Sequence, residues 1–215
     1  MKDEEVQEKA KKIVASAKDI REQTRDLVTD VIRHSGDALG QFPKAVNRVV
    51  DGAREGLDSV VKDRQGDVLR DVMDGVSDGL SKGANAVKYT FEEANDRGHN
   101  FAKDEIVGTL KDLRVLESLF VDRMGQLIKS SVKLPVEQSK DLMIHAQNAA
   151  KSIRPAVGSA IEVAEKNPIG LTKETASVAV GVTRRVTGSL FQAVAGVLDG
   201  VGDAIGGKSD SDKSV

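Results

Sequence analysis

The chain contains no cysteine and no tryptophan among its 215 residues, and aromatic residues make up only 3% of it. The lack of cysteine excludes disulfides, thiol catalysis and thiolate metal sites, and it fits a reducing compartment. With so few bulky side chains, a close-packed enzyme core around a polar pocket is not expected. The composition therefore favours a structural or surface-binding protein over an enzyme.

The charged residues show no excess of one sign, because 32 Lys and Arg residues stand against 34 Asp and Glu residues. They form no basic block, so nucleic-acid binding is not expected. No apolar run reaches the roughly 18 residues that a transmembrane helix needs, and the acidic N-terminus is not a secretory signal. We therefore expect a cytoplasmic protein, with any membrane or granule association at the periphery.

Residues 1–36 carry apolar residues at alternating spacings of four and three, the seam of a left-handed coiled coil. Because the seam is made of small or β-branched residues, we expect one helix over 1–36 that packs within a larger bundle. The alternative is self-association through the larger seam residues. These are Val6, Ile13, Ile20, Leu27 and Val31.

Beyond Pro43 the apolar spacing changes to eleven residues, as at Val46, Leu57 and Val68. Eleven residues over three turns favour a straight or slightly right-handed helix. This spacing predicts one long glycine-containing helix over 43–94, with Gly66 as the expected point of any break.

Three further helical segments follow. Residues 100–134 carry a leucine-rich stripe and are expected to anchor the core. Residues 135–167 predict short helices that begin at Pro135 and Pro155. Residues 172–206 predict an apolar C-terminal helix, and 207–215 a disordered tail. Together the segments predict an all-α fold, with long amphipathic helices in one elongated bundle or coiled-coil-like arrangement.

A motif with two glycines occurs at residues 51–57 and again at 74–80, with a looser copy at 199–205. Each copy places small residues four apart on one helix face, although glycine costs about 1 kcal/mol in a helix interior. Two interpretations remain open: close packing against another helix, or a helix that stays labile until it binds.

The C-terminal segment has no charged residue from Val186 to Leu198. This run is too short to span a bilayer but suits an interfacial helix. The alternative is that the same stripe packs against the helix of 100–134. The candidate surface-binding residues are Val186, Leu190, Phe191, Val194, Val197, Leu198 and Val201.

The sequence contains no phosphate-binding loop and no metal-binding or catalytic motif. His34, His99 and His145 lie far apart without metal-ligand spacing, and we expect them on the surface or at helix caps. No catalytic, cofactor-binding or metal-ligating residue is therefore predicted, and no cofactor.

These features resemble the amphipathic helical surface proteins: phasins of bacterial storage granules, exchangeable apolipoproteins and late-embryogenesis-type proteins. The resemblance covers about half of the chain and identifies no site residue. The chain departs from phasins in its helical glycines and from late-embryogenesis proteins in its leucine-rich segment. Resemblance to a phasin implies an oligomeric, non-enzymatic granule coat in the cytoplasm. The resemblance is carried by alanine-, glycine- and valine-rich helix faces, the lack of Cys and Trp, and the eleven-residue spacings of Val46, Leu57 and Val68 and of Ala179, Leu190 and Val201.

We therefore expect a non-enzymatic protein that coats or associates with a hydrophobic surface, such as a storage granule, a lipid droplet or a membrane interface. Each valine or leucine buried there contributes roughly 1.5–3 kcal/mol. The alternative is a self-assembling scaffold that forms oligomers or filaments through the heptad seam and the glycine faces. A homo-oligomer is expected in either case.

Overall fold

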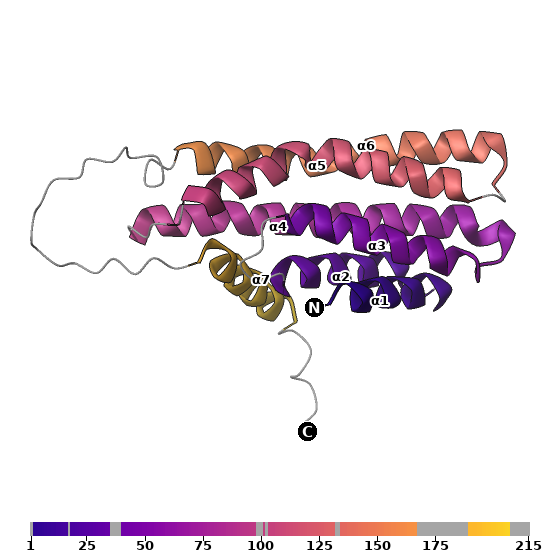
Figure 1. The fold of residues 1–215 in the computed structure, drawn as a ribbon, viewed down its shortest axis with the longest axis horizontal. Helices are drawn as coiled ribbons and strands as arrows, with labels where there is room; N and C mark the ends of the chain where they lie inside the picture. The colour runs from indigo at the N-terminus through magenta and orange to yellow at the C-terminus, as the bar shows by residue number, and fades with distance from the viewer. Residues whose placement is uncertain are drawn as a thin grey trace, which may run out of the picture.

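The computed structural model confirms an all-α fold (Figure 1). It describes residues 2–16, 18–34, 40–97, 101, 103–131, 134–166 and 189–206, except for the side chains of 103, 191 and 201–206. No strand occurs within these ranges. The helices are α1 (Asp3–Ser16), α2 (Ile20–His34), α3 (Gln41–Leu57), the short 3-10 helix η1 (Lys62–Arg64), α4 (Gln65–Arg97), α5 (Lys103–Ser130), α6 (Val136–Lys166) and α7 (Leu190–Gly206).

The helices form an elongated bundle of three layers (Figure 1). Helices α5 and α6 make one outer layer, α3 and α4 lie in the middle, and α1 and α2 lie on the other side. Across the layers α6 packs on α4, α5 on α3, α1 on α3 and α2 on α4. The core is continuous through all three layers and is filled mainly by valine, leucine and alanine.

The segment predicted as one helix over 1–36 is divided into α1 and α2. Asp19 adopts a left-handed conformation with φ of 47°, which a continuous right-handed helix does not accommodate. The heptad register continues across this break. The larger seam residues face the interior, because Val6, Ile20, Leu27 and Val31 are at most 5% exposed, and Ile13 packs half-buried against the core.

Both full copies of the glycine motif lie where a helix of the α1–α2 layer crosses closely. A Cβ atom on Gly52 would lie 2.2 Å from the carbonyl oxygen of Gln7 in α1. A Cβ atom on Gly75 would lie 2.4 Å from the carbonyl oxygen of Arg21 in α2. Both distances fall far inside van der Waals contact with backbone atoms. Close packing, one of the two interpretations of the motif, therefore holds for these two copies.

Gln7 and Arg21 occupy equivalent positions, two heptads apart, so the two crossings repeat the same geometry. The acidic residue at the fifth position of each copy also makes an equivalent contact. Glu55 accepts a hydrogen bond from Gln7 (2.6 Å), and Asp78 accepts one from Arg21 (2.8 Å). The pairs α1–α3 and α2–α4 are thus two versions of one helix-docking arrangement.

The long helix predicted over 43–94 is also divided, into α3 and α4. The break lies at residues 58–64, and Gly66 falls inside the first turn of α4. Gln65 stabilises the break, because its amide donates to the carbonyl oxygens of Leu57 (3.1 Å) and Val60 (3.3 Å). The Leu57 carbonyl, which ends α3, also accepts from the backbone N–H of Val60 (3.0 Å), and Val60 itself lies in the connection to α4.

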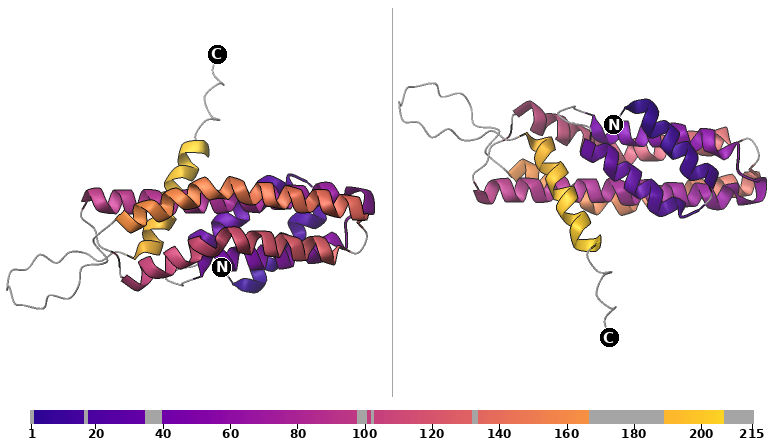
Figure 2. Two further views of the ribbon diagram at one scale, coloured as in Figure 1. Left: turned by 90° about the horizontal axis from the view of Figure 1, so that it is seen from above. Right: turned by 90° about the horizontal axis from the view of Figure 1, so that it is seen from below.

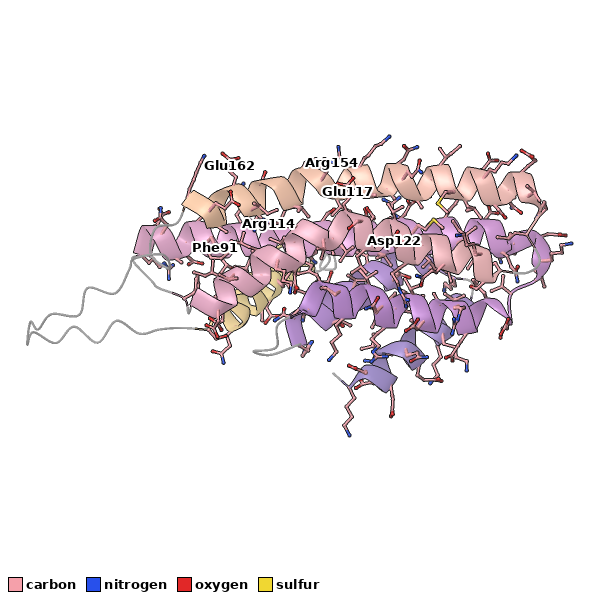
Figure 3. All side chains as sticks on the ribbon, turned by 45° about the horizontal axis from the view of Figure 1, so that its top comes forward. Phe91, Arg114, Glu117, Asp122, Arg154 and Glu162 are labelled. Carbon is pink, nitrogen blue, oxygen red and sulfur yellow. The ribbon has the colours of Figure 1, made fainter. Side chains whose placement is uncertain are left out.

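Residues 135–167, predicted as short helices, form the single long helix α6. Pro155 lies inside α6 rather than at a helix start. Proline has no backbone N–H, so the carbonyl oxygen of Lys151, four residues earlier, lacks its helical donor. Both residues are exposed, so water can hydrogen-bond to this carbonyl instead. Ion pairs cross from α6 to α5, as between Arg154 and Glu117 (Figure 3).

Asp112 of α5 caps the beginning of α3, which has no side-chain cap of its own. The backbone N–H groups of Gly40 and Gln41 donate to its carboxylate. Burial nevertheless raises the pKa of Asp112 above its ordinary value of 3.8. Because the folded chain holds this proton more tightly than the unfolded chain, the stability that Asp112 contributes is complete below pH 3.8 and is lost as the pH rises through its folded pKa.

Replacing Asp112 with asparagine is expected to keep the capping oxygen and to remove this pH dependence. The free energy of unfolding of Asp112→Asn should therefore rise relative to wild type between about pH 3.5 and about pH 7. Urea unfolding at the two pH values measures this difference in the free energy of unfolding between wild type and Asp112→Asn. Asp112→Ala is the control, because it also lacks the carboxyl but loses the cap, so it should be less stable than Asp112→Asn by about 1 kcal/mol at both pH values. A constant difference between wild type and Asp112→Asn would contradict the assignment.

Candidate functional site: helix α7 and its seat

Helix α7 lies outside the three layers, against α4 and α2 (Figure 1). Seen from below, it runs obliquely to the long axis of the bundle (Figure 2). Its 17 residues include only two charged ones, Asp199 and Asp203, whereas 31% of the whole chain is charged. An almost uncharged helix thus sits at the periphery of a highly charged bundle.

The apolar stripe of α7 faces the bundle. Leu190, Val194 and Leu198 are at most 2% exposed, and Val197 packs half-buried against the core. The partners are mainly α4 and α2, so the stripe does not pack mainly on α5, the helix of segment 100–134, as the alternative interpretation expected. Val186 lies outside the described residues. The side chains of Phe191 and Val201 are likewise not described.

Polar contacts at two places bind α7 to the bundle. At its beginning, the carboxylate of Glu105 in α5 accepts hydrogen bonds from the hydroxyl of Ser189 (3.1 Å) and the backbone N–H of Leu190 (3.3 Å). A carboxylate at this end also complements the helix dipole. Farther along, Asp199 forms an ion pair with Arg33 of α2 at 3.0 Å. Exposed pairs of this kind contribute at most about 1 kcal/mol.

The seat of α7 on α4 is incompletely filled. A groove of about 340 Å³ runs between the two helices. Its α7 wall is Val197 and Leu198. The α4 wall is largely polar and comprises Asp78, Ser81, Lys82, Asn85, Ala86 and Tyr89.

The looser glycine motif lies on α7, and of its two glycines the structure describes the surroundings of Gly200. A Cβ atom on Gly200 of the motif, or on Gly196 one turn before it, would meet nothing within 4 Å. At Gly52 and Gly75, by contrast, such an atom would collide with backbone. Close packing therefore does not explain Gly200, and a labile helix remains as its interpretation.

An ionic cluster joins three helices elsewhere in the bundle. His145 of α6 contacts Asp74 of α4 at 2.8 Å, and Arg21 of α2 lies between Asp74 and Asp78. Burial, followed by the neighbouring carboxylates of Asp74 and Asp67, raises the pKa of Asp71. Arg21 pairs with Asp74 and Asp78 of α4, and His145 of α6 contacts Asp74, so the arrangement links the three layers.

Of the other two histidines, only His34 lies among the described residues. The Nδ1–H group of His34 donates to the carbonyl oxygen of Asp30, 2.9 Å away in its own helix, and His99 lies outside the described residues. Within the described ranges, no three potential metal ligands come together. None of the described helices combines the length and apolarity needed to cross a bilayer.

Sequence reasoning missed the residues that hold α7 in place. Glu105 and Ser189 are 84 positions apart, and Arg33 and Asp199 are even more distant. No local spacing signals such pairs. The polar wall of α4 gives no signal either, because Ser81, Lys82 and Asn85 read as an ordinary solvated helix face.

Comparisons with known proteins place the chain in a family. Neither the curated proteins nor the solved structures gave a match. One family model, described as a family of unknown function (DUF6781), matches residues 1–207. Since the match covers nearly the whole chain, the protein belongs to this family, DUF6781.

Proposed function

We propose that this protein associates with a hydrophobic surface through α7 and that it acts without catalysis. The surface is a storage granule, a lipid droplet or a membrane interface. The observation that carries the proposal is the nature of α7. It is a nearly uncharged helix, on the outside of a charged bundle, with an apolar stripe and an incompletely filled seat.

Association requires α7 to leave its seat. Its three buried side chains would exchange burial against α2 and α4 for burial in the surface. Each contributes roughly 1.5–3 kcal/mol in either place, so the two states differ little in free energy. Residues 167–188 connect α6 to α7 and allow a reach of about 70 Å at full extension. The α1–α6 bundle therefore need not unfold when α7 moves.

We do not propose the self-assembling scaffold as a second function. The seam residues that it would use already fill the interior of the chain. The glycines at 52, 56, 75 and 79 already receive α1 and α2. Formation of a homo-oligomer stays a prediction.

Flotation of the purified chain with a neutral lipid emulsion tests the proposal. We expect the protein to rise with the emulsion and to stay at the bottom of a gradient without emulsion. Added salt should not weaken the association, because apolar burial rather than charge drives it. Protein that stays at the bottom in both gradients would refute surface association.

A further inference from the structure

The groove between α4 and α7 is lined by the ammonium of Lys82, which has no partner among the described side chains. Lys82 is half-buried, and no hydrogen bond or ion pair of its ammonium occurs in the described part of the chain. The other half-buried lysines there, such as Lys44 and Lys88, do form ion pairs. A partly desolvated ammonium gains strongly from an anionic partner.

Three further polar side chains beside Lys82 also have unused hydrogen-bonding capacity. Ser81, Asn85 and Tyr89 line the same groove, with spacings of four that place them on one face of α4. No hydrogen bond from their side chains occurs among the described residues. Asp78, at the end of the groove, is bound by Arg21 at 2.8 Å, so its charge is balanced locally.

The opposite wall is apolar. Val197 and Leu198 of α7 face the polar row, and Ala86 adds to the apolar lining. A groove of about 340 Å³ falls in the size range of small-molecule sites. A polar, cationic wall opposite an apolar wall matches a molecule with an anionic head and a hydrocarbon chain.

We infer that this groove binds a free single-chain amphiphile with an anionic headgroup. Its headgroup lies at Lys82 and within reach of Asn85, and its chain lies along Val197 and Leu198. The site is present with α7 seated, so the inference goes beyond surface association and does not rest on it.

A second groove in the bundle lacks this combination. It lies between α1 and α2, and its lysines Lys9 and Lys12 already pair with Glu5 and Glu8. An anionic headgroup would therefore compete there with existing partners. The comparison singles out Lys82 as the recognition residue.

The test titrates decanoate and its uncharged analogue decanol into the full chain, below the concentration at which either aggregates. Tyr89 is the only tyrosine and no tryptophan is present, so intrinsic fluorescence reports on the groove itself. Wild type should bind decanoate about tenfold more tightly than decanol, the gain of one charge-assisted contact. Lys82→Gln should bind both equally, at the affinity of wild type for decanol.

Lys111→Gln is the matched control, because Lys111 is an exposed lysine of α5 with the same charge. It should keep the preference for decanoate. No fluorescence change with either compound, or a preference that persists in Lys82→Gln, would overturn the inference. Neutral emulsion without fatty acid forms a separate arm. Flotation there, with or without decanoate binding, reports only on surface association, so the two proposals fail independently.

Discussion

Gly75→Ala is expected to destabilise the protein by about 2–4 kcal/mol, although alanine is the better helix former. The added methyl would lie 2.4 Å from the carbonyl oxygen of Arg21 and 2.7 Å from the Cβ atom of Thr24. These atoms belong to the backbone and to a branched side chain, so they cannot yield without moving α2 away from α4. Urea unfolding followed by circular dichroism measures the loss.

Gly158→Ala provides the matched control. Gly158 also lies inside a helix, α6, but a Cβ atom there would meet nothing within 4 Å. This substitution should stabilise the protein by up to about 1 kcal/mol. Equal effects of the two substitutions would show that helix propensity, rather than the crossing of α2 and α4, decides the role of Gly75.

Leu190→Glu combined with Val194→Glu is expected to abolish flotation with neutral lipid. Both side chains are at most 2% exposed, and a carboxylate without a partner is not tolerated in that seat. Helix α7 should therefore detach, and its charged stripe should no longer enter an apolar surface. The α1–α6 bundle should remain helical, since its own core lies between its three layers. Flotation, circular dichroism and mass measurement are made on one preparation.

The control places the same two charges on α5, as Val107→Glu with Val115→Glu. These valines are 51% and 43% exposed, so the control should float like wild type. Under the scaffold alternative, the α7 variant would instead dissociate the assembly or unfold it. An α7 variant that leaves both flotation and oligomer mass unchanged would contradict both hypotheses about this segment.

The helical class and much of the buried surface follow from local spacing. The heptad seam predicts the buried positions of α1 and α2 because the pattern of apolar residues survives the break at Asp19. The leucine-rich stripe of 100–134 likewise corresponds to α5, where Leu113, Leu116 and Phe120 are at most 1% exposed. Periodicity reports which face is buried and is insensitive to a short interruption.

The helix ends were less predictable, because they depend on contacts that the spacing does not contain. The break between α3 and α4 is stabilised by the side chain of Gln65, which is an ordinary helix-forming residue in sequence. Pro155, an ordinary signal for a helix start, is tolerated inside α6 on the exposed side.

The candidate site, too, was predictable from the sequence only in part. The apolar stripe of α7 was visible in the sequence, but its present partners were not, because α2 and α4 lie far away along the chain. The third glycine motif resembles the first two in sequence and differs from them in having an open face. Only the arrangement of the helices separates these two situations.

The order of the layers along the chain also determines when each helix can become buried during synthesis. Helices α1 and α2, of 14 and 15 residues, are marginal in isolation, and each needs a partner made later. The partner of α2 is α4, which ends only at Arg97. At a synthesis rate of about 5–20 residues per second, the apolar seam of α2 therefore remains exposed for several seconds before α4 is complete.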